Sequence, residues 1–528
     1  MTELLLKIVA SVVSACLFCV CTFKTVGAMQ QAGYKNGVFW RWLKRKDNLQ
    51  YNRLAVLALC LGLSTAIVSL CFSFLSVTWA LAISAVPFAL LCLVFFWADG
   101  KYALKVKTVR TGRLCRLFGI YLFFVAVVGY LLIALLGFLK DWNGSELYGL
   151  VSYVPFAVLP LLLPALLCLA NGVTSIFENA RNKKFVKRAG TVLNETEIIR
   201  VGVVGSYGKT SVKNILKTIL SEKYAVVETP ASYNTPIGIA KTVFSSAFAN
   251  KQVLIAEIGA RKAGDVSQLC ALVKPDYAIF TGVCEQHIET FGSIENVLKE
   301  KSEILKCGAK KAVCGNGLRG AVEENENTAF ACETKDVTLA LTGTRFVLTL
   351  GGEEIFVNTK LLGAGAVENV ALAATLAYEM GLTVAEIARG IEKIQPVPHR
   401  LQLMENGGVY ILDDGYNCNI VGAKGALEVL STHTGRKCVV TPGIVECGIL
   451  EERINKELGA ALAAADTDLI ILIGQTLVQP IKDGYLQAGG AVEKLQSACT
   501  LADGQKLLAD WVQAGDAVLF LNDLPDVY

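Results

Sequence analysis

The chain has 528 residues, of which 53% are hydrophobic and only 18% are charged. Soluble domains average about 25% charged residues, so part of this chain is expected to lie outside water. The net charge is only +4, from 50 Lys and Arg against 46 Asp and Glu, which argues against a nucleic-acid partner. The length excludes a small disulfide-stapled fold, and the hydrophobic content excludes disorder.

The first third of the chain contains long uncharged runs. Residues 54–98 carry no charged side chain, and one crossing of a bilayer needs about 20 apolar residues, so this run holds two crossings. We therefore expect an α-helical membrane domain over residues 1–180. Its five spans are expected near residues 4–23, 54–75, 77–98, 117–139 and 150–177. Pro155, Pro160 and Pro164 predict a kinked or irregular last span.

The charges between the runs predict an orientation. Residues 24–53, 99–116 and 181–188 are rich in Lys and Arg, and five spans place all three segments on one side. The positive-inside rule makes that side cytoplasmic. The sequence thus predicts a multi-pass cell-membrane protein with its N-terminus outside and its catalytic domains in the cytoplasm. The basic segments could also bind membrane lipids. Cleavage of residues 1–28 as a signal peptide is disfavoured, because the segment does not begin with basic residues.

The second part of the chain alternates apolar strands with periodic helices, which is typical of α/β domains with a mostly parallel sheet. A strand over 198–204 precedes the loop GSYGKTS (205–211), and a helix is expected over 212–221. A glycine loop between a strand and a helix binds phosphate through backbone N–H groups. In such a loop Lys209 reaches the terminal phosphates of a nucleotide and Thr210 can ligate Mg²⁺. The nucleotide-binding residues are then Gly205, Ser206, Gly208, Lys209, Thr210 and Ser211.

Two further strands end in candidate metal ligands. Glu257 lies near the end of a strand over 253–258, where a carboxylate can hold magnesium; taken alone, a solvated strand-end acid is the better interpretation. His287 follows a strand over 277–283, and a single histidine is more often structural than a ligand. The 17 cysteines show no paired C-x-x-C spacing in this part, so a structural zinc site is not expected.

Seven motifs in order carry a resemblance to a known family. They are GSYGKTS (205–211), SYNTPIG (232–238), EIGARKAGD (257–265), HIETFGSIE (287–295), EKSEI (300–304), VPHRLQ (397–402) and DDGYNCN (413–419). In this order and spacing, residues 195–520 resemble the Mur ligase superfamily, most closely its D-alanyl-D-alanine-adding branch. The resemblance implies a central P-loop domain over 195–400 and a C-terminal Rossmann-like domain over 401–528.

The resemblance also implies roles for individual residues. Lys209 contacts the ATP γ-phosphate. Thr210 and Glu257 hold a first Mg²⁺, His287 ligates a second, and Lys301 is carbamylated and bridges the metals. The remaining assignments place Asn369 near adenine, Arg400 and Asp414 on the nucleotide, and Asn234 at the carboxylate substrate. The catalytic residues are then Lys209, His287 and Lys301.

The chemistry implied is ATP-dependent amide formation. A substrate carboxylate attacks the γ-phosphate, giving an acyl phosphate and ADP, and an amine then displaces phosphate. The expected partners are ATP, a carboxylate-bearing cell-wall precursor and an amino acid or dipeptide that supplies the amine.

Several positions depart from the family pattern. Gly282 stands where an asparagine is usual, Gly365-Ala366 where His-Asn is usual, and His399 where a glycine is usual. The Lys-Gly-Ser-Arg segment that helps to recognise the amine is replaced at residues 521–524, so the amine is not carried over.

The spans replace the N-terminal UDP-sugar domain of soluble members. We therefore expect a lipid-linked precursor at the cytoplasmic membrane face; the alternative is that the spans are an anchor and the substrate is soluble. The competing functions are a membrane-attached poly-γ-glutamate-type polymerising ligase and a non-catalytic ATP-binding scaffold of wall synthesis. A lipid II-amidating enzyme is disfavoured because its four-cysteine zinc ribbon has no counterpart.

Overall fold

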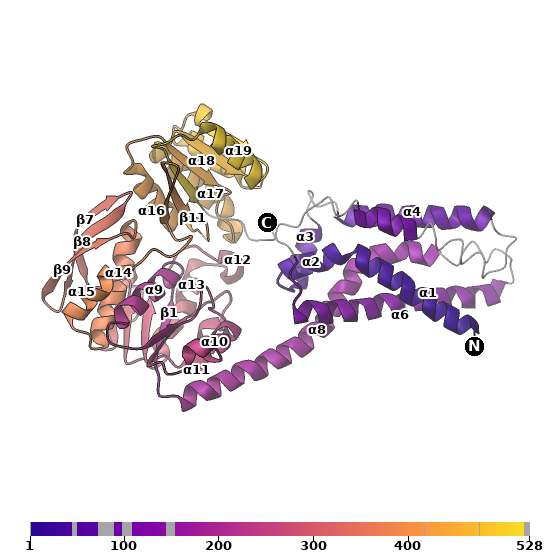
Figure 1. Cartoon of the computed structure of the whole chain (residues 1–528), viewed down its shortest axis with the longest axis horizontal. Helices are drawn as coiled ribbons and strands as arrows, with labels where there is room; N and C mark the ends of the chain where they lie inside the picture. Colours follow the sequence, from indigo (N-terminus) through magenta and orange to yellow (C-terminus); the bar gives the residue numbers. More distant parts are fainter. Residues whose placement is uncertain are drawn as a thin grey trace. The chain divides into compact units, whose positions relative to one another are not determined.

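The computed structural model describes residues 2–44, 50–71, 89–97, 108–143, 154–416, 418–474 and 476–521. The chain divides into two units, one within residues 1–182 and one that begins at Lys183. Figure 1 labels their elements.

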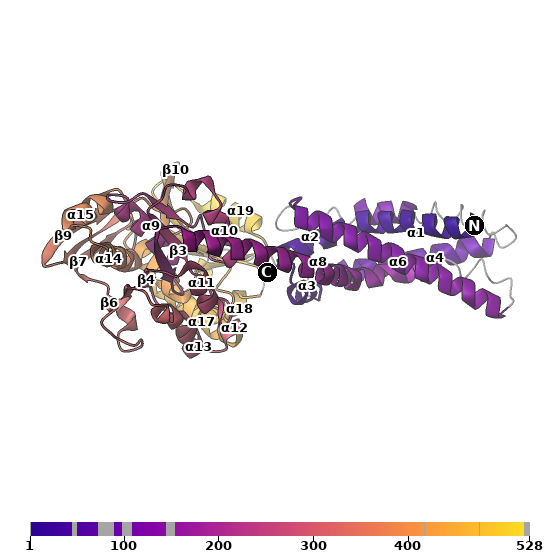
Figure 2. The same cartoon turned by 90° about the horizontal axis from the view of Figure 1, so that it is seen from below.

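The first unit is helical. Its helices are α1 (Thr2–Cys21), α2 (Phe23–Gln31), α3 (Asn36–Leu43), α4 (Gln50–Cys71), α6 (Gly112–Asn143) and the first part of α8 (Val154–Glu195). A buried cluster of apolar side chains joins α1, α2, α3, α4, α6 and α8. Figure 2 shows α1, α4 and α6 running side by side in this unit.

The described residues support a helical membrane unit but not all five expected spans. Within the part of the chain that the structure describes, two helical segments are long and apolar enough to cross a membrane, namely 112–132 and 159–195. A third candidate is the helix pair over 11–21 and 23–31, which bends by 53° at its break and overlaps the expected span over 4–23. Thr22 lies at this bend and its hydroxyl donates to the Phe18 carbonyl at 2.7 Å, a contact that often bends helices. Most of the expected span over 77–98 lies outside the described residues.

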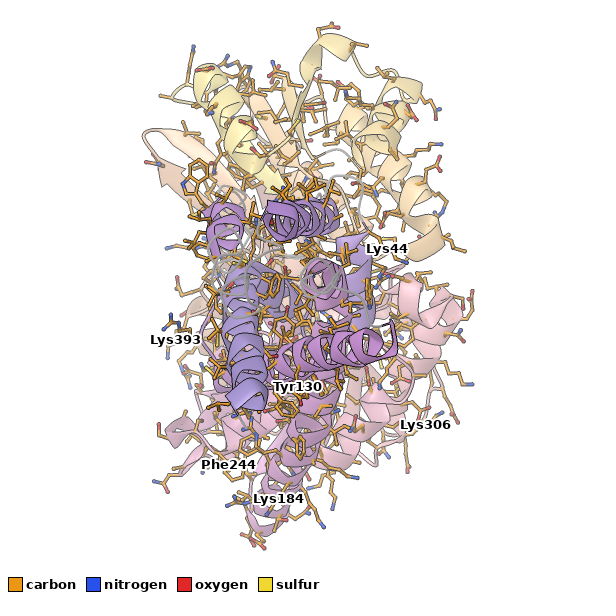
Figure 3. The ribbon with its side chains drawn as sticks, turned by 90° about the vertical axis from the view of Figure 1, so that its right-hand side faces the viewer. Lys44, Tyr130, Lys184, Phe244, Lys306 and Lys393 are labelled. Carbon is orange, nitrogen blue, oxygen red and sulfur yellow. The ribbon has the colours of Figure 1, made fainter. Side chains whose placement is uncertain are left out.

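The last expected span, for which the sequence predicts a kink or an irregular stretch, is a continuous helix over its described residues. Pro160 and Pro164 lie inside α8, which runs without interruption to Glu195. Beyond Asn182 the helix belongs to the second unit, where Ala189 and Leu193 are fully buried. The ring of Phe185 lies 5.0 Å from that of Phe244, which Figure 3 labels together with Lys184 of α8. The end of α8 is therefore part of the core of the second unit.

The second unit begins with a six-stranded parallel sheet. Its order is β2 (Val226–Glu228), β3 (Val253–Glu257), β1 (Ile199–Val204), β4 (Tyr277–Phe280), β5 (Lys311–Cys314) and β6 (Thr328–Phe330). β1, which lies centrally, pairs in parallel with β3 and β4. Its residues are largely valine and isoleucine, as expected of a strand that is buried on both faces.

Helices cover both faces of this sheet. One face packs on α9 (Lys209–Leu220), α14 (Ala364–Glu379) and α15 (Val384–Glu392). The other packs on the end of α8, α10 (Pro236–Val243), α11 (Asp265–Val273), α12 (Ile288–Phe291) and α13 (Ile294–Ser302). Short 3₁₀ turns follow at η1 (Ser246–Phe248), η2 (Glu303–Lys306) and η3 (Asn316–Leu318). The parallel α/β architecture that the sequence predicts is confirmed.

An antiparallel sheet, which the sequence patterns did not indicate, lies between the two α/β parts in the chain. It consists of β7 (Glu333–Ala340), β8 (Gly343–Leu350) and β9 (Glu353–Thr359). Its apolar face joins the core formed by α9, α14 and α15.

The C-terminal part contains a second six-stranded sheet. Its order is β10 (Gln402–Asn406), β11 (Val409–Asp414), β15 (Ala517–Leu521), β12 (Lys437–Thr441), β13 (Leu469–Ile473) and β14 (Leu495–Ala498). Only the β10–β11 pair is antiparallel. The surrounding helices are α16 (Ile420–Ser431), α17 (Glu451–Ala464), α18 (Val478–Gln487) and α19 (Leu501–Trp511), with 3₁₀ turns η4 (Gly448–Leu450) and η5 (Val492–Lys494).

Candidate nucleotide and ligase site

The glycine loop connects β1 to α9, as the motif predicts. Gly208 has φ +74°, and a Cβ there would lie 2.6 Å from Oδ1 of Asn369. At Gly205 a Cβ would lie 1.9 Å from the Thr281 hydroxyl. Both positions therefore require glycine, and Asn369 of α14 lies directly against the loop. Ser206 lies in the loop, and Thr210 and Ser211 lie in the first turn of α9.

Two lysines converge on this loop. Lys209 Nζ donates to the Gly205 carbonyl at 2.8 Å and to the Ser206 carbonyl at 3.3 Å. Lys301 Nζ, from α13, also donates to the Gly205 carbonyl, at 3.0 Å. Burial, together with the charge of Lys209, lowers the pKa of Lys301 to about 7. Burial also lowers the pKa of Lys209. The site thus holds two closely spaced amines where anionic phosphate is expected.

Glu257 at the end of β3 contacts two other predicted residues. Its Oε2 accepts from the Thr210 hydroxyl at 3.0 Å, and its Oε1 accepts from the Asn234 amide at 3.1 Å. Hydroxyl and carboxylate oxygens are the ligands that Mg²⁺ prefers, so Thr210 and Glu257 suit the predicted first metal position.

A residue that sequence analysis missed supports this carboxylate. Lys213 is 1% exposed, and its Nζ donates to the Thr229 and Ala231 carbonyls at 2.6 and 2.5 Å and lies 3.4 Å from Glu257 Oε2. Burial lowers the pKa of Lys213, while Glu257 opposes this shift. The available signal was a lysine beside the apolar stripe of α9, one turn after Lys209.

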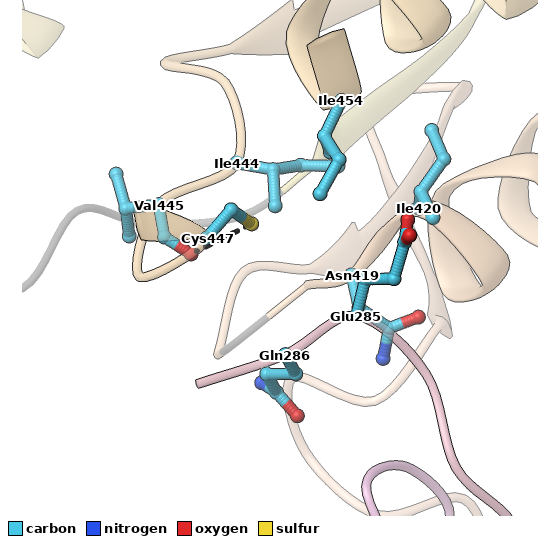
Figure 4. Close-up of a pocket in the computed structure, with 8 residues that line it drawn as sticks. All are labelled: Glu285, Gln286, Asn419, Ile420, Ile444, Val445, Cys447 and Ile454. Atoms are coloured by element: carbon cyan, nitrogen blue, oxygen red, sulfur yellow. Dashed lines mark hydrogen bonds between the residues drawn. The ribbon is translucent and has the colours of Figure 1, made fainter. Parts of the chain in front are cut away.

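His287 does not join the Thr210–Glu257 pair. Its Nδ1 lies 3.0 Å from Oε2 of Glu446, which precedes η4. Arg453 of α17 likewise pairs with Glu285 at 2.5 Å. Among the described residues, no group of three His, Cys, Asp or Glu side chains is placed to hold a metal, and the predicted second metal site at His287 and Lys301 stays a prediction. A narrow, mostly apolar crevice lies beside these contacts, lined by Glu285, Gln286, Asn419, Ile420, Ile444, Val445, Cys447 and Ile454 (Figure 4).

The start of the C-terminal part reaches the loop through Arg400. Its Nη2 lies 3.4 Å from the Thr210 hydroxyl, and its guanidinium lies over the Tyr416 ring at 4.2 Å. The Tyr416 hydroxyl contacts the Ser232 hydroxyl at 2.5 Å. Sequence analysis missed Tyr416, although it lies inside the DDGYNCN motif.

His399, beside Arg400, has φ +60°, a conformation that favours glycine. This explains why glycine is usual there. Its Nδ1 lies 2.7 Å from Asp413, a contact that glycine could not make.

Asp414 is placed at the same junction. Its Oδ1 accepts from the Leu401 backbone N–H at 3.1 Å, and burial raises its pKa to about 6 while Arg400 opposes this shift. Because the folded pKa lies above the ordinary value of 3.8, the ionised carboxylate costs stability above pH 6, and this cost disappears as the pH falls toward 4.

Asp414→Asn is therefore expected to stabilise the ligand-free protein at pH 7.5 by about 1–2 kcal/mol, an advantage that fades below pH 5. Thermal unfolding of both proteins at the two pH values measures this. An equal difference at both pH values would contradict the assignment of the cost to ionisation of Asp414.

Gly282, where the family pattern has asparagine, packs directly against the side chain of Tyr207. A Cβ at Gly282 would lie 2.3 Å from the Tyr207 hydroxyl, so the phenol occupies the space that a side chain at 282 would need. Burial, with the charge of Glu368, raises the Tyr207 pKa to about 12 and keeps the phenol neutral.

Gly282→Ala is expected to displace this ring and destabilise the protein by about 1–3 kcal/mol. Adding Tyr207→Ser should recover most of that loss, because the clash is then removed. A double-mutant cycle on thermal unfolding measures the coupling, and strictly additive effects would contradict the packing.

The other positions that differ from the family pattern lie in α14 and at the end of β15. Gly365 and Ala366 lie in the first turn of α14. Leu521 ends β15, and the residues after it lie outside the described part of the chain.

The comparisons with known proteins agree with this geometry. The family model described as Mur ligase middle domain matches residues 203–377. These residues are therefore similar to the middle domain of Mur ligases. They include the glycine loop, Glu257, His287, Lys301 and Asn369.

Curated relatives point to one branch of the Mur ligases. The chain is 28% identical over 291 residues to the UDP-N-acetylmuramoyl-tripeptide–D-alanyl-D-alanine ligase of Bacillus subtilis, covering 52% of this chain and 62% of that protein. It is 29% identical over 293 residues to the Escherichia coli ligase of the same name, covering 52% and 64%. The chain thus spans less than two thirds of the length of these relatives.

Solved structures show the same similarity. The MurF ligase of Thermotoga maritima in complex with ADP has a TM-score of 0.58 at 25% identity, covering 66% of this chain and 81% of that one. A MurF from Acinetobacter baumannii shares the fold at TM-score 0.58 and 21% identity, covering 66% and 78%. The predicted resemblance to Mur ligases of the MurF type is confirmed.

Proposed function

We propose that the chain is an ATP-dependent, ADP-forming ligase that joins an amine to a carboxylate through an acyl phosphate. One observation carries the proposal. Lys209, Lys301 and the Thr210–Glu257 pair surround the glycine loop, and Arg400 from the C-terminal part lies 3.4 Å from Thr210. A nucleotide triphosphate bound there is contacted from both α/β parts, so closure of these parts can exclude water from a reactive intermediate.

Different residues bind the phosphates, the nucleotide and the carboxylate substrate. Backbone N–H groups of the loop and Lys209 hold the phosphates and offset the charge that develops on the transferred group. Asn369 lies beside the adenine, Asp414 and Arg400 orient the nucleotide, and Asn234 faces the carboxylate substrate. Lys213 holds Glu257 in place from beneath.

Two Mg²⁺ ions complete this proposal. Thr210 and Glu257 would hold the first, and His287 with a carbamylated Lys301 would hold the second, where they would neutralise phosphate charge. The neutral amine is the form that reacts with CO₂, and the buried setting of Lys301 favours that form. In the structure His287 faces Glu446, so it must turn from this partner to reach a metal.

We further propose that the carboxylate belongs to a cell-wall precursor, lipid-linked and presented at the cytoplasmic membrane face, and that the amine is an amino acid or dipeptide. The names of the curated relatives support a wall precursor. Two apolar helices long enough to cross a membrane support its presentation at the membrane.

The test uses full-length protein in nanodiscs with Mg-ATP, a bacterial lipid-precursor extract and a pool of amino acids and dipeptides. ADP release is followed, and any new amide is identified by mass, with Lys209→Met as the inactive control. We expect an amide product that partitions with lipid. If only a soluble UDP-linked peptide is converted, the helices are an anchor. If no extract fraction or soluble peptide stimulates ADP release, the ligase proposal is wrong.

A further inference from the structure

Three arginines surround one buried carboxylate in the first unit. Arg116 of α6 donates through Nε to Glu178 Oε1 at 2.7 Å, and Arg181 of α8 donates to Oε2 at 2.7 Å. Arg113, one turn before Arg116, donates to the Ser175 hydroxyl at 3.4 Å. The Glu178 side chain is 4% exposed, whereas those of Arg116 and Arg181 are 45% and 62% exposed. Within the described part of the chain, Arg113, Arg116 and Arg181, here called the arginine cluster, thus have one carboxylate for three positive charges.

A ring contact and hydrogen bonds, rather than ion pairs, hold Arg113 of the arginine cluster in position. The Arg113 guanidinium lies 3.9 Å from the centre of the Tyr34 ring. Tyr34 has φ +59°, and its carbonyl accepts from the Asn171 amide at 2.9 Å. Asn171 also donates to Asn36 at 2.8 Å, which joins the start of α3 to α8. Because several elements fix Tyr34 and Arg113, the site is preorganised.

Two buried polar atoms at this place lack a partner. Within the described residues, Nε of Arg113 and Oδ1 of Asn171 are buried and make no hydrogen bond. Buried polar atoms are almost always hydrogen-bonded, and an unpaired guanidinium N–H is costly. The free Nε–H of Arg113 is a donor without an acceptor, next to two exposed guanidinium groups.

The arginine cluster lies where the apolar segments begin and end. The apolar segment of α6 begins at Gly112, and the uncharged run of α8 ends just before Glu178. Trp40 and Trp42 of α3 are half-buried beside Phe39, and tryptophan gathers at the membrane–water interface. A ligand bound to the arginine cluster would therefore lie at the depth of the lipid headgroups.

We propose that the arginine cluster binds the phosphate of a membrane lipid, with preference for a dianionic phosphoryl headgroup. Guanidinium groups match phosphate oxygens in a planar, two-pronged geometry, and a dianion balances the two charges that Glu178 leaves over. The lipid tail lies along the apolar surface of the helices. The proposal does not depend on the ligase chemistry and can fail separately from it.

The experiment titrates full-length protein in detergent with phosphatidic acid and counts bound lipid by native mass spectrometry, without ATP. Diacylglycerol with the same tails lacks the phosphate, and phosphatidylglycerol carries a single charge. We expect phosphatidic acid to bind tightest and diacylglycerol not to bind at a defined stoichiometry. Equal retention of diacylglycerol would overturn the proposal.

The variants locate the site. Arg113→Gln and Arg181→Gln are each expected to weaken phosphatidic acid binding by about tenfold, because each removes a charge-assisted hydrogen bond. Lys184→Gln, which removes the same charge from the next turn of α8, should leave binding within about twofold. Glu178→Gln should bind at least as tightly as the wild type, since it removes the repelling carboxylate. Unchanged binding in both arginine variants would overturn the proposal.

Arg181 is exposed, so its variant carries the test if Arg113→Gln fails to fold. Inorganic pyrophosphate serves as the soluble competitor. If it binds as tightly as phosphatidic acid, the ligand is a free phosphate compound and the lipid assignment is wrong. Lys209→Met should not alter lipid binding, which separates this result from any failure of the ligase proposal.

Discussion

Lys209→Met is expected to lower the rate of ADP release by about three orders of magnitude while leaving the fold intact. Among the described residues, the Lys209 ammonium donates to two carbonyls of its own loop, Gly205 and Ser206, and forms no ion pair, so its loss breaks no salt bridge there. Instead, the positive charge of Lys209 is needed to neutralise the phosphoryl group during its transfer. Pre-steady-state and steady-state ADP release with Mg-ATP and precursor extract measure the effect.

The matched control is Lys360→Met, which makes the same change at an exposed position after β9. It should retain the wild-type rate. A Lys209→Met protein that releases ADP within about tenfold of the wild type would show that the glycine loop does not perform the phosphoryl transfer.

Lys301→Ala is expected to lower the rate by about two to three orders of magnitude, because the proposed carbamate has no substitute. Lys301→Arg should be equally impaired, since arginine keeps a positive charge but forms no carbamate. Removal of bicarbonate and CO₂ should slow the wild type reversibly and leave both variants unaffected. A Lys301→Arg protein with near wild-type activity would contradict the role of a carbamylated lysine.

A variant of the neighbouring Glu300 serves as a control that distinguishes the carbamate role of Lys301 from a purely structural role. Its carboxylate accepts from the backbone N–H groups of Gly264 and Val266 at 2.8 Å each, at the start of α11. Glu300→Gln should therefore lower stability by about 1 kcal/mol without the bicarbonate effect.

The parts of the site that are local in sequence could be predicted. The strand before Gly205, the two glycines and the helix that begins at Lys209 follow from one short motif, because each residue's role depends on its immediate neighbours. The strand that ends at Glu257 follows in the same way from its apolar pattern. These elements lie within a few residues of their predicted bounds.

Contacts between distant segments could not be predicted. The support of Glu257 by Lys213 depends on the path of the chain after β2, and the fit of Tyr207 against Gly282 depends on the pairing of β1 with β4. The bend at Thr22 reflects a side-chain hydrogen bond that the length of an apolar run does not reveal.

The central claim is that the chain activates a carboxylate as an acyl phosphate, and hydroxylamine tests it most directly. Full-length protein in nanodiscs is incubated with Mg-ATP and precursor extract, with hydroxylamine in place of the unknown amine. We predict that a precursor hydroxamate forms in equal amount to ADP, and that Lys209→Met forms neither. ADP release without any hydroxamate would contradict carboxylate activation by this chain.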